Sequence, residues 1–358
     1  HWDLENEFPL EAIAEAHALG LTNLHIPAEY GGMGMGIADE VLVIEEFAWG
    51  DPGFSTAAYS NGLTAGPIIT GGTEEQKEEY LGRLVKEPKI ASYCVTEPAA
   101  GSDVASIETT AVRDGDHYIL NGEKMWVTNG AQAKILVLFA KDVDHPDYGV
   151  KKHGGSTAFI VDSSYEGFSV GKKEDKLGIR SSDTCTLILE NCKVPVKNIL
   201  KGVGNGFPIA MNALDNSRIG IAAQALGIAQ GAFEAALKYA HEREAFGKPI
   251  AHHQMIMAYL ADMATRIEAS RLLIYQASWV KQQHYEHGGP RHSKEASMAK
   301  LFAGDTAMWV TERAIQVLGG YGYTKEFPVE RFFRDAKITQ IYEGTQEVQR
   351  IVIARALK

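Results

Sequence analysis

The chain contains little cysteine, with only Cys94, Cys185 and Cys192 among its 358 residues. These three form no CxxC motif and cannot all pair with one another, which favours a reducing compartment. The sequence also lacks an apolar run of the roughly 20 residues needed to cross a bilayer, so we predict no membrane span. Basic blocks are missing as well. No cluster exceeds a lysine pair, and the net charge of −11 argues against a general nucleic-acid binder.

Common metal-binding and dinucleotide-binding patterns are also missing. The twelve histidines show no HExxH spacing, and His252-His253 is more typical of a surface or helix end, so we predict no metal site. The glycine run Gly31–Gly36 lies between predicted helices rather than after a strand, which indicates a turn and not a phosphate-binding loop. The first residues match no secretory or transit peptide. Because the chain starts at His1, we expect that an N-terminal segment was processed or left out.

Helical periodicity dominates both ends of the chain. The N-terminal section contains three predicted helices, Leu10–Leu19, Ile37–Trp49 and Glu74–Val85, and Thr73 is a suitable N-cap for the third. After residue 208, the spans 209–248, 250–289 and 291–327 contain no proline and are rich in helix-forming residues. They predict three long helices separated at Pro249 and Pro290, followed by a shorter terminal helix.

Between these sections the period changes to two. Asp114-Gly115 and Asn121-Gly122 are typical hairpin turns, and they flank a predicted strand over His117–Leu120. Further strands are predicted over Ile135–Ala140, Thr157–Val161 and Thr184–Leu189. We therefore predict an α+β protein in three parts: an N-terminal helical domain over 1–90, a middle β-barrel-like domain over 91–205, and a C-terminal antiparallel four-helix bundle over 206–358.

Glu343 has the most suggestive surroundings of any carboxylate. It lies between the apolar pair Ile341-Tyr342 and a Gly344-Thr345 break, where Thr345 is a suitable N-cap for the last helix. Desolvation at such a junction raises the pKa of a carboxyl group, which suits a general base. On this local pattern alone, a surface glutamate before a helix remains the alternative.

Several motifs in a fixed order resemble the acyl-CoA dehydrogenases, flavoenzymes that desaturate acyl-CoA thioesters between the α and β carbons. One signature is matched by the run from Cys94 to Asp103 together with Ser106. A second is matched by Gln316, Gly319, Gly320, Gly322, Tyr323, Glu326, Arg331 and Asp335. Three further matches are Trp126-Val127-Thr128, the Leu214–Arg218 run and Arg243 with Phe246-Gly247, and Glu343-Gly344-Thr345 completes the set.

The resemblance implies a bound FAD, because no amino-acid side chain accepts hydride well. Residues of the middle domain would surround the flavin, namely Tyr93, Val95, Thr96, Gly101, Ser102, Trp126, Val127 and Thr128. Residues of the C-terminal section would complete the site, namely Arg243, Phe246, Gln254, Gln316, Gly319, Gly320, Thr345 and Glu347. Arg243, Phe246, Gln316 and Gly320 would reach the flavin of a neighbouring subunit, which implies a homotetramer built as a dimer of dimers. Without the resemblance, the local sequence would favour Trp126 as a core residue and Arg243 as a solvated residue at a helix end.

The resemblance also places the acyl-CoA substrate. Ser102, Asp215, Arg218 and Gly344 would contact it, although Asp215 and Arg218 alone fit an ion pair near a helix start equally well. A minority of relatives carry the catalytic glutamate at the position of Ser217, so Ser217 leaves Glu343 as the base. Tyr59 occupies the position at the bottom of the acyl pocket, where its bulk would shorten the cavity.

The function implied is FAD-dependent dehydrogenation of short- to medium-chain acyl-CoA to trans-2-enoyl-CoA in fatty acid β-oxidation, with electrons passing to an electron-transferring flavoprotein. The alternatives are a dehydrogenase for branched short-chain substrates and a non-catalytic, flavoprotein-like assembly protein. An acyl-CoA oxidase is usually much longer than this chain, so the chain length argues against that activity. We expect the protein in the cytoplasm if it is bacterial, and otherwise in the mitochondrial matrix.

Overall fold

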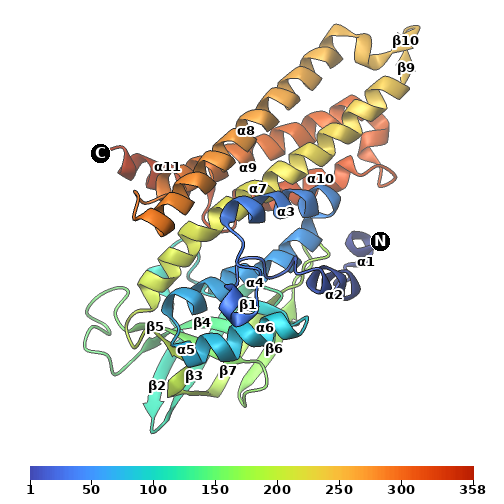
Figure 1. The fold of residues 1–358 in the computed structure, drawn as a ribbon. Coiled ribbons are helices and arrows are strands. Elements are labelled where there is room, and N and C mark those ends of the chain that lie inside the picture. Colours follow the sequence, from blue (N-terminus) through green and yellow to red (C-terminus); the bar gives the residue numbers. More distant parts are fainter.

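The computed structural model describes residues 1–358, with helices at both ends of the chain and a sheet between them (Figure 1). The N-terminal helices are α1 (Trp2–Glu5), α2 (Leu10–Ala18), α3 (Ile37–Gly50), α4 (Pro52–Gly71), α5 (Glu74–Gln76) and α6 (Gly82–Lys86). The predicted cap is confirmed, since the Thr73 hydroxyl accepts from the Gln76 N–H and the Gln76 side chain accepts from the Thr73 N–H. The predicted third helix is interrupted by a π-helical stretch over Lys77–Leu81.

Helix α4 is the main helix that the sequence pattern missed. Four glycines and an internal Pro67 give this segment a low intrinsic helix propensity. It forms because Asp51 caps its first turn, accepting from the Phe54 N–H at 2.8 Å, and because Ala57, Ala65 and other small residues are fully buried along it. Tertiary packing therefore outweighs local propensity here, and α4 becomes one wall of the cavity described below.

The central section forms one eight-stranded sheet. Its strands are β1 (Ala91–Cys94), β2 (Thr110–Asp114), β3 (His117–Thr128), β4 (Ile135–Asp142), β5 (Ser156–Asp162), β6 (Phe168–Lys173), β7 (Thr184–Pro195) and β8 (Ile199–Leu200). The order is β6-β7-β3-β2-β4-β5-β8, and β1 pairs in parallel with β4. Both faces of β4 and β5 are buried, so the sheet forms part of two apolar cores.

One of the two predicted hairpin turns is wrong. Asp114-Gly115 does join β2 to β3, with Asp114 paired to His117. Asn121-Gly122, in contrast, lies inside β3, which continues to Thr128, and marks a register shift against β7. Gly122 has φ +149°, and a Cβ added to it would lie 2.6 Å from the Thr109 hydroxyl oxygen. The glycine allows close approach of two backbones rather than a chain reversal.

The C-terminal section is a bundle of long helices that run alternately up and down (Figure 1). These are α7 (Gly206–Glu242), α8 (Gln254–His287) and α9 (Ser293–Leu318), followed by α10 (Val329–Ala336) and α11 (Gln346–Ala356). Pro249 and Pro290 fall in the connections, as predicted. The bundle core is rich in alanine, and α3 contributes Ile37, Val41 and Ile44 to it. None of the helices is both long and apolar enough to span a membrane.

Candidate active site

A cavity of about 710 Å³ opens where α4, the loop after β1, the end of β3, α7 and the segment before α11 meet. Most of its surface is apolar, and polar groups are concentrated at a few points. The predicted site residues that line it are Tyr93, Val95, Thr96, Gly101, Ser102, Trp126, Thr128, Arg218, Glu343, Gly344 and Thr345. Residues from three separate sections of the sequence are thus brought to one cavity.

Trp126 projects into this cavity because of an irregularity in β3. The pairing of β3 with β7 shifts register between Lys124 and Val127, and Trp126 has φ +58°. A bulge of this kind redirects a side chain out of the normal alternation of a strand. The indole is consequently 55% exposed, whereas Val127 beside it is buried in the sheet core and does not line the cavity.

The loop after β1 is fixed by a buried ion pair that the sequence analysis did not identify. Lys124 is fully buried, and its ammonium lies 2.5 Å from a carboxylate oxygen of Glu97. Glu97 also accepts from the Thr109 hydroxyl, and Met125 donates its N–H to the Thr96 carbonyl at 2.9 Å. In the sequence, Lys124 interrupts the apolar alternation of β3, and this interruption is the signal that could have indicated the buried ion pair.

Glu343 lies in a strained turn at the floor of the cavity. Its φ is +52° and that of Gly344 is +93°, so two successive residues adopt left-handed conformations before Thr345 caps α11. One carboxylate oxygen, Oε2, is buried and has no hydrogen-bond partner. Desolvation raises the pKa of Glu343 to about 7, although the nearby cations Lys300 and Arg218 oppose that rise. The pKa shift predicted from the local pattern is confirmed.

Two residues that hold this turn were missed. The buried ammonium of Lys300, on α9, donates to the Gly344 carbonyl at 2.7 Å. The side-chain amide of Gln349, on α11, donates to the same carbonyl at 2.8 Å and to the Glu343 carbonyl at 3.3 Å. A lysine on an otherwise alanine-rich helix face is the signal that could have indicated Lys300.

Asp215 and Arg218 form the ion pair that was one of the two interpretations, with Nη1 2.7 Å from Oδ1. Asp215 also accepts from the Ser293 hydroxyl at 2.7 Å and does not line the cavity. Arg218 does line it, and its Nε is buried without a partner. Burial lowers the pKa of Arg218, while Asp215 and Glu343 act in the opposite direction.

The remaining predicted cofactor residues lie outside the cavity. Arg243, Phe246, Gln254, Gln316, Gly319 and Gly320 are exposed at the end of the bundle where β9 (Glu244–Ala245) and β10 (Lys248–Pro249) lie (Figure 1). Phe246 is 97% exposed, which is unusual for an aromatic side chain of a folded protein. Glu347 is exposed in the first turn of α11. None of these seven residues lines the cavity that contains Glu343.

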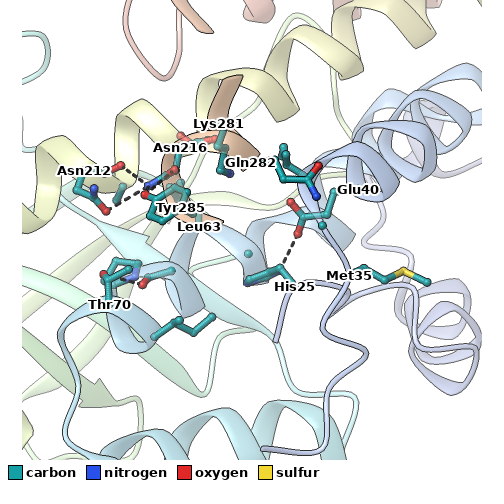
Figure 2. Close-up of a pocket in the computed structure, with 18 of the residues that line it drawn as sticks. His25, Met35, Glu40, Leu63, Thr70, Asn212, Asn216, Lys281, Gln282 and Tyr285 are labelled. Atoms are coloured by element: carbon teal, nitrogen blue, oxygen red, sulfur yellow. Dashed lines mark hydrogen bonds and ion pairs between the residues drawn. The ribbon is translucent and has the colours of Figure 1, made fainter. Parts of the chain in front are cut away.

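A second cavity, of about 370 Å³, lies between α3, α4, α7 and α8 (Figure 2). It contains the His25–Glu40 pair, with Nδ1 2.9 Å from Oε1, and the Lys281 ammonium. Tyr59 and Leu63 line both cavities and so lie between them. A Cβ on Gly220 would lie 2.6 Å from the Tyr59 ring, so this glycine makes room for the tyrosine against α7.

Comparison with known families matches nearly the whole length of the chain. Residues 1–88, 92–192 and 204–358 match the N-terminal, middle and C-terminal domains of acyl-CoA dehydrogenase. The short-chain specific acyl-CoA dehydrogenase of Clostridium acetobutylicum is 45% identical over 98% of this chain and 90% of its own length. The chain belongs to the acyl-CoA dehydrogenase family.

Other family relatives are similarly close. The acryloyl-CoA reductase (NADH) of Anaerotignum propionicum is 45% identical over 99% of this chain and 88% of its own. Butyryl-CoA dehydrogenase from Megasphaera elsdenii superposes with a TM-score of 0.93 at 43% identity, over 99% of this chain and 92% of that one. A chain in a structure of the electron transferring flavoprotein of Acidaminococcus fermentans gives a TM-score of 0.94 at 46% identity, with coverages of 99% and 91%.

The cavity fits the FAD that acyl-CoA dehydrogenases use. An acyl-CoA dehydrogenase from Bacillus anthracis, solved with FAD, is 33% identical with a TM-score of 0.91 over 97% of this chain and 62% of its own. In the present structure, Trp126 presents an exposed indole to the cavity and nothing lies within 4 Å of a Cβ added to Gly101. An aromatic surface and an open glycine loop suit a planar ring with a polar chain. The protein is an FAD-dependent acyl-CoA dehydrogenase.

Proposed function

We propose that this enzyme removes two hydrogens from short- to medium-chain acyl-CoA, giving the trans-2-enoyl-CoA, with Glu343 as the base. The observation that carries the proposal is the Glu343 carboxylate, which lines the cavity with an unpartnered Oε2 and has a pKa of about 7. A base works best when its pKa lies near the working pH, because it is then both largely ionised and basic enough to take a proton.

Glu343 and the residues around it have separate roles in proton removal, FAD binding and substrate orientation. Glu343 takes the α proton of the thioester, while bound FAD supplies the acceptor for the β hydride, so that one proton and one hydride leave together. Tyr93, Thr96, Trp126 and Thr128 would hold FAD against the β-domain side of the cavity. Arg218, with its buried and unpartnered Nε, would orient the substrate from α7. The largely apolar walls exclude water from the reacting carbons.

The preference for shorter acyl chains is supported by Tyr59. Its ring lies against α7 beside Gly220 and separates the cavity that contains Glu343 from the second cavity. An acyl tail that extends away from Glu343 along α4 would meet this ring. Relatives described as short-chain specific and butyryl-CoA dehydrogenases support the same size range.

The proposed electron partner is an electron-transferring flavoprotein, supported by the related chain found in a structure of such a flavoprotein.

We also propose a homotetramer. The support is the set of six exposed residues at the end of the bundle near β9 and β10, which have no role within one chain, namely Arg243, Phe246, Gln254, Gln316, Gly319 and Gly320. One relative is named for the reverse direction, acryloyl-CoA reductase (NADH), and we propose that reduction would use the same groups. In that direction, Glu343 would return the proton to the α carbon.

A substrate panel tests the proposal. Purified protein should be yellow, contain about one FAD per chain, and lose its flavin colour anaerobically on addition of acyl-CoA. Butyryl-, hexanoyl- and octanoyl-CoA should bleach it faster than isobutyryl- and 2-methylbutyryl-CoA. Faster bleaching by the two branched substrates would favour the branched-chain alternative. A protein that takes up no FAD, or that no acyl-CoA bleaches, would contradict the proposal.

A further inference from the structure

Lys300 is one of the least expected side chains near the site. It is fully buried on α9, among Ala296, Ala299 and Ala303, which are also fully buried. Burying an ammonium group is costly unless it gains hydrogen bonds and charge partners. Both partners of Lys300 belong to the segment that follows Glu343, namely the Gly344 carbonyl at 2.7 Å and the Gln346 side-chain oxygen at 3.4 Å.

The turn that Lys300 contacts is strained, with two successive residues at positive φ. Glu343 has φ +52°, a left-handed conformation that a glutamate rarely adopts. Lys300 and Gln349 both donate to the Gly344 carbonyl, from two different helices. The peptide after the base is therefore fixed from two sides, which fixes the direction of the Glu343 Cα–Cβ bond.

Lys300 also contributes charge. Its ammonium donates to backbone rather than to the carboxylate, so it leaves Oε2 free to accept a proton. Burial lowers the pKa of Lys300 to about 8, and the nearby Glu343 acts against that decrease, so the group remains largely protonated at neutral pH. A cation near a carboxylate lowers the carboxylate pKa and offsets part of the effect of desolvation.

The other groups that interact electrostatically with Glu343 or Lys300 do not replace this charge. They are Arg218 on α7, Asp305 on α9, Glu347 on α11, Tyr59 on α4, Tyr93 on β1 and Tyr342 beside the base. Arg218 is the one other cation among them, and Asp215 pairs with it at 2.7 Å. Lys300 is therefore the cation near Glu343 that has no carboxylate hydrogen-bonded to it.

We propose that Lys300 is a positioning residue for the general base, which fixes the Glu343–Gly344 turn through the Gly344 carbonyl and places a positive charge near the carboxylate. This inference depends on the proposed role of Glu343. Lys300 itself touches neither the reacting carbons nor the cofactor, since it does not line the cavity. It acts through the residue that does.

Three substitutions separate the two contributions of Lys300. Lys300→Met removes charge and hydrogen bond, Lys300→Gln retains a donor without charge, and Lys300→Arg retains the charge. Lys281→Met is the matched control, because it removes another buried ammonium, one that lines the second cavity and interacts electrostatically with Glu40 rather than Glu343. The measurement is the anaerobic flavin-reduction rate by stopped flow from pH 5.5 to 9.5, on FAD-loaded protein with butyryl-CoA.

Removing the charge should move the acid limb of the rate profile to higher pH, because a carboxylate that loses a nearby cation ionises less readily. We expect an upward shift of about one pH unit in Lys300→Met and Lys300→Gln, and none in Lys300→Arg or Lys281→Met. The rate at the high-pH plateau should fall about tenfold or more in Lys300→Met and recover partly in Lys300→Gln, which can still donate to the Gly344 carbonyl.

The outcome is decisive even if one variant is unstable. If Lys300→Met does not retain FAD, the comparison of Lys300→Gln with Lys300→Arg still isolates the charge. An unchanged acid limb in both neutral variants would overturn the inference. Glu343→Gln, measured in parallel, keeps this result separate from the proposed function: near-native bleaching by that variant would refute the base itself, whatever Lys300 does.

Discussion

Glu343 combines three properties that follow from its position in the chain. The residue lies in a left-handed turn, so its carboxylate points into the cavity rather than along α11. Its Oε2 is buried without a partner, and desolvation raises its pKa to about 7. Ser217, at the position that carries the base in a minority of relatives, has no carboxylate and instead donates to the Leu214 carbonyl.

Tyr59 gives a test of substrate size at the scale of one side chain. Tyr59→Ala should join the two cavities and move the preferred acyl chain to more carbons, because the ring no longer blocks the tail. Initial rates with acyl-CoA of four to sixteen carbons measure this directly. Tyr285→Ala is the matched control, since Tyr285 lines only the second cavity. An unchanged preference in Tyr59→Ala would mean that another residue limits the chain length.

At the scale of elements, β3 does most to shape the cavity. Its first irregularity, at Gly122, brings the strand against Thr109, and its second turns Trp126 toward the cavity. Both depend on a backbone conformation that alternation of residue types does not indicate. For this reason the sequence pattern ended the strand at Leu120 and interpreted Asn121-Gly122 as a hairpin turn.

Gly122→Ala should therefore destabilise the protein more than Gly115→Ala. The added methyl group at 122 would lie 2.6 Å from the Thr109 hydroxyl and 2.8 Å from its Cα, whereas at 115 it meets open space. We expect a loss of about 1–2 kcal/mol at 115, where φ is +60°, and about 2–4 kcal/mol at 122, where φ is +149° and the methyl group also lies too close to Thr109. Thermal unfolding of the two FAD-loaded variants gives the comparison. Equal losses would show that the two backbones do not approach closely.

Regular elements were predictable and irregular ones were not. The long helices after Gly206 followed from the absence of proline, and the Thr73 and Thr345 caps followed from local chemistry. Helix α4 was missed because burial, and not propensity, stabilises it. Lys124 and Lys300 were missed because their roles depend on Glu97 and Gly344, which are distant in sequence and meet only in the fold.

At the scale of the whole molecule, the exposed end of the bundle bears on how the flavin site is completed. Arg243, Phe246 and Gln316 are solvent-exposed in one chain, far from Glu343, and by resemblance they would complete the flavin site of a neighbouring subunit. Burial against a neighbour would also account for an aromatic ring that is 97% exposed. The active site would then be complete only in the assembly.

Arg243→Ala should weaken FAD retention, because a charged hydrogen bond to phosphate contributes roughly 1.5–3 kcal/mol. The FAD dissociation constant of the reconstituted protein, measured by flavin fluorescence, should rise about tenfold or more. Arg291→Ala is the control, as Arg291 is an exposed arginine in the loop between α8 and α9, near the opposite end of the bundle. A stable monomer that binds FAD as tightly as the assembly would contradict the shared site.

The central claim is that Glu343 removes the α proton, and one variant tests it most directly. Glu343→Gln keeps the shape of the side chain but cannot accept a proton, so the variant should fold, bind FAD and bind butyryl-CoA. Stopped-flow bleaching of its flavin under anaerobic conditions should be at least about a thousandfold slower than in the native enzyme, within the usual range of general-base contributions. Bleaching at a near-native rate would show that the proton leaves by another route and that Glu343 is not the base.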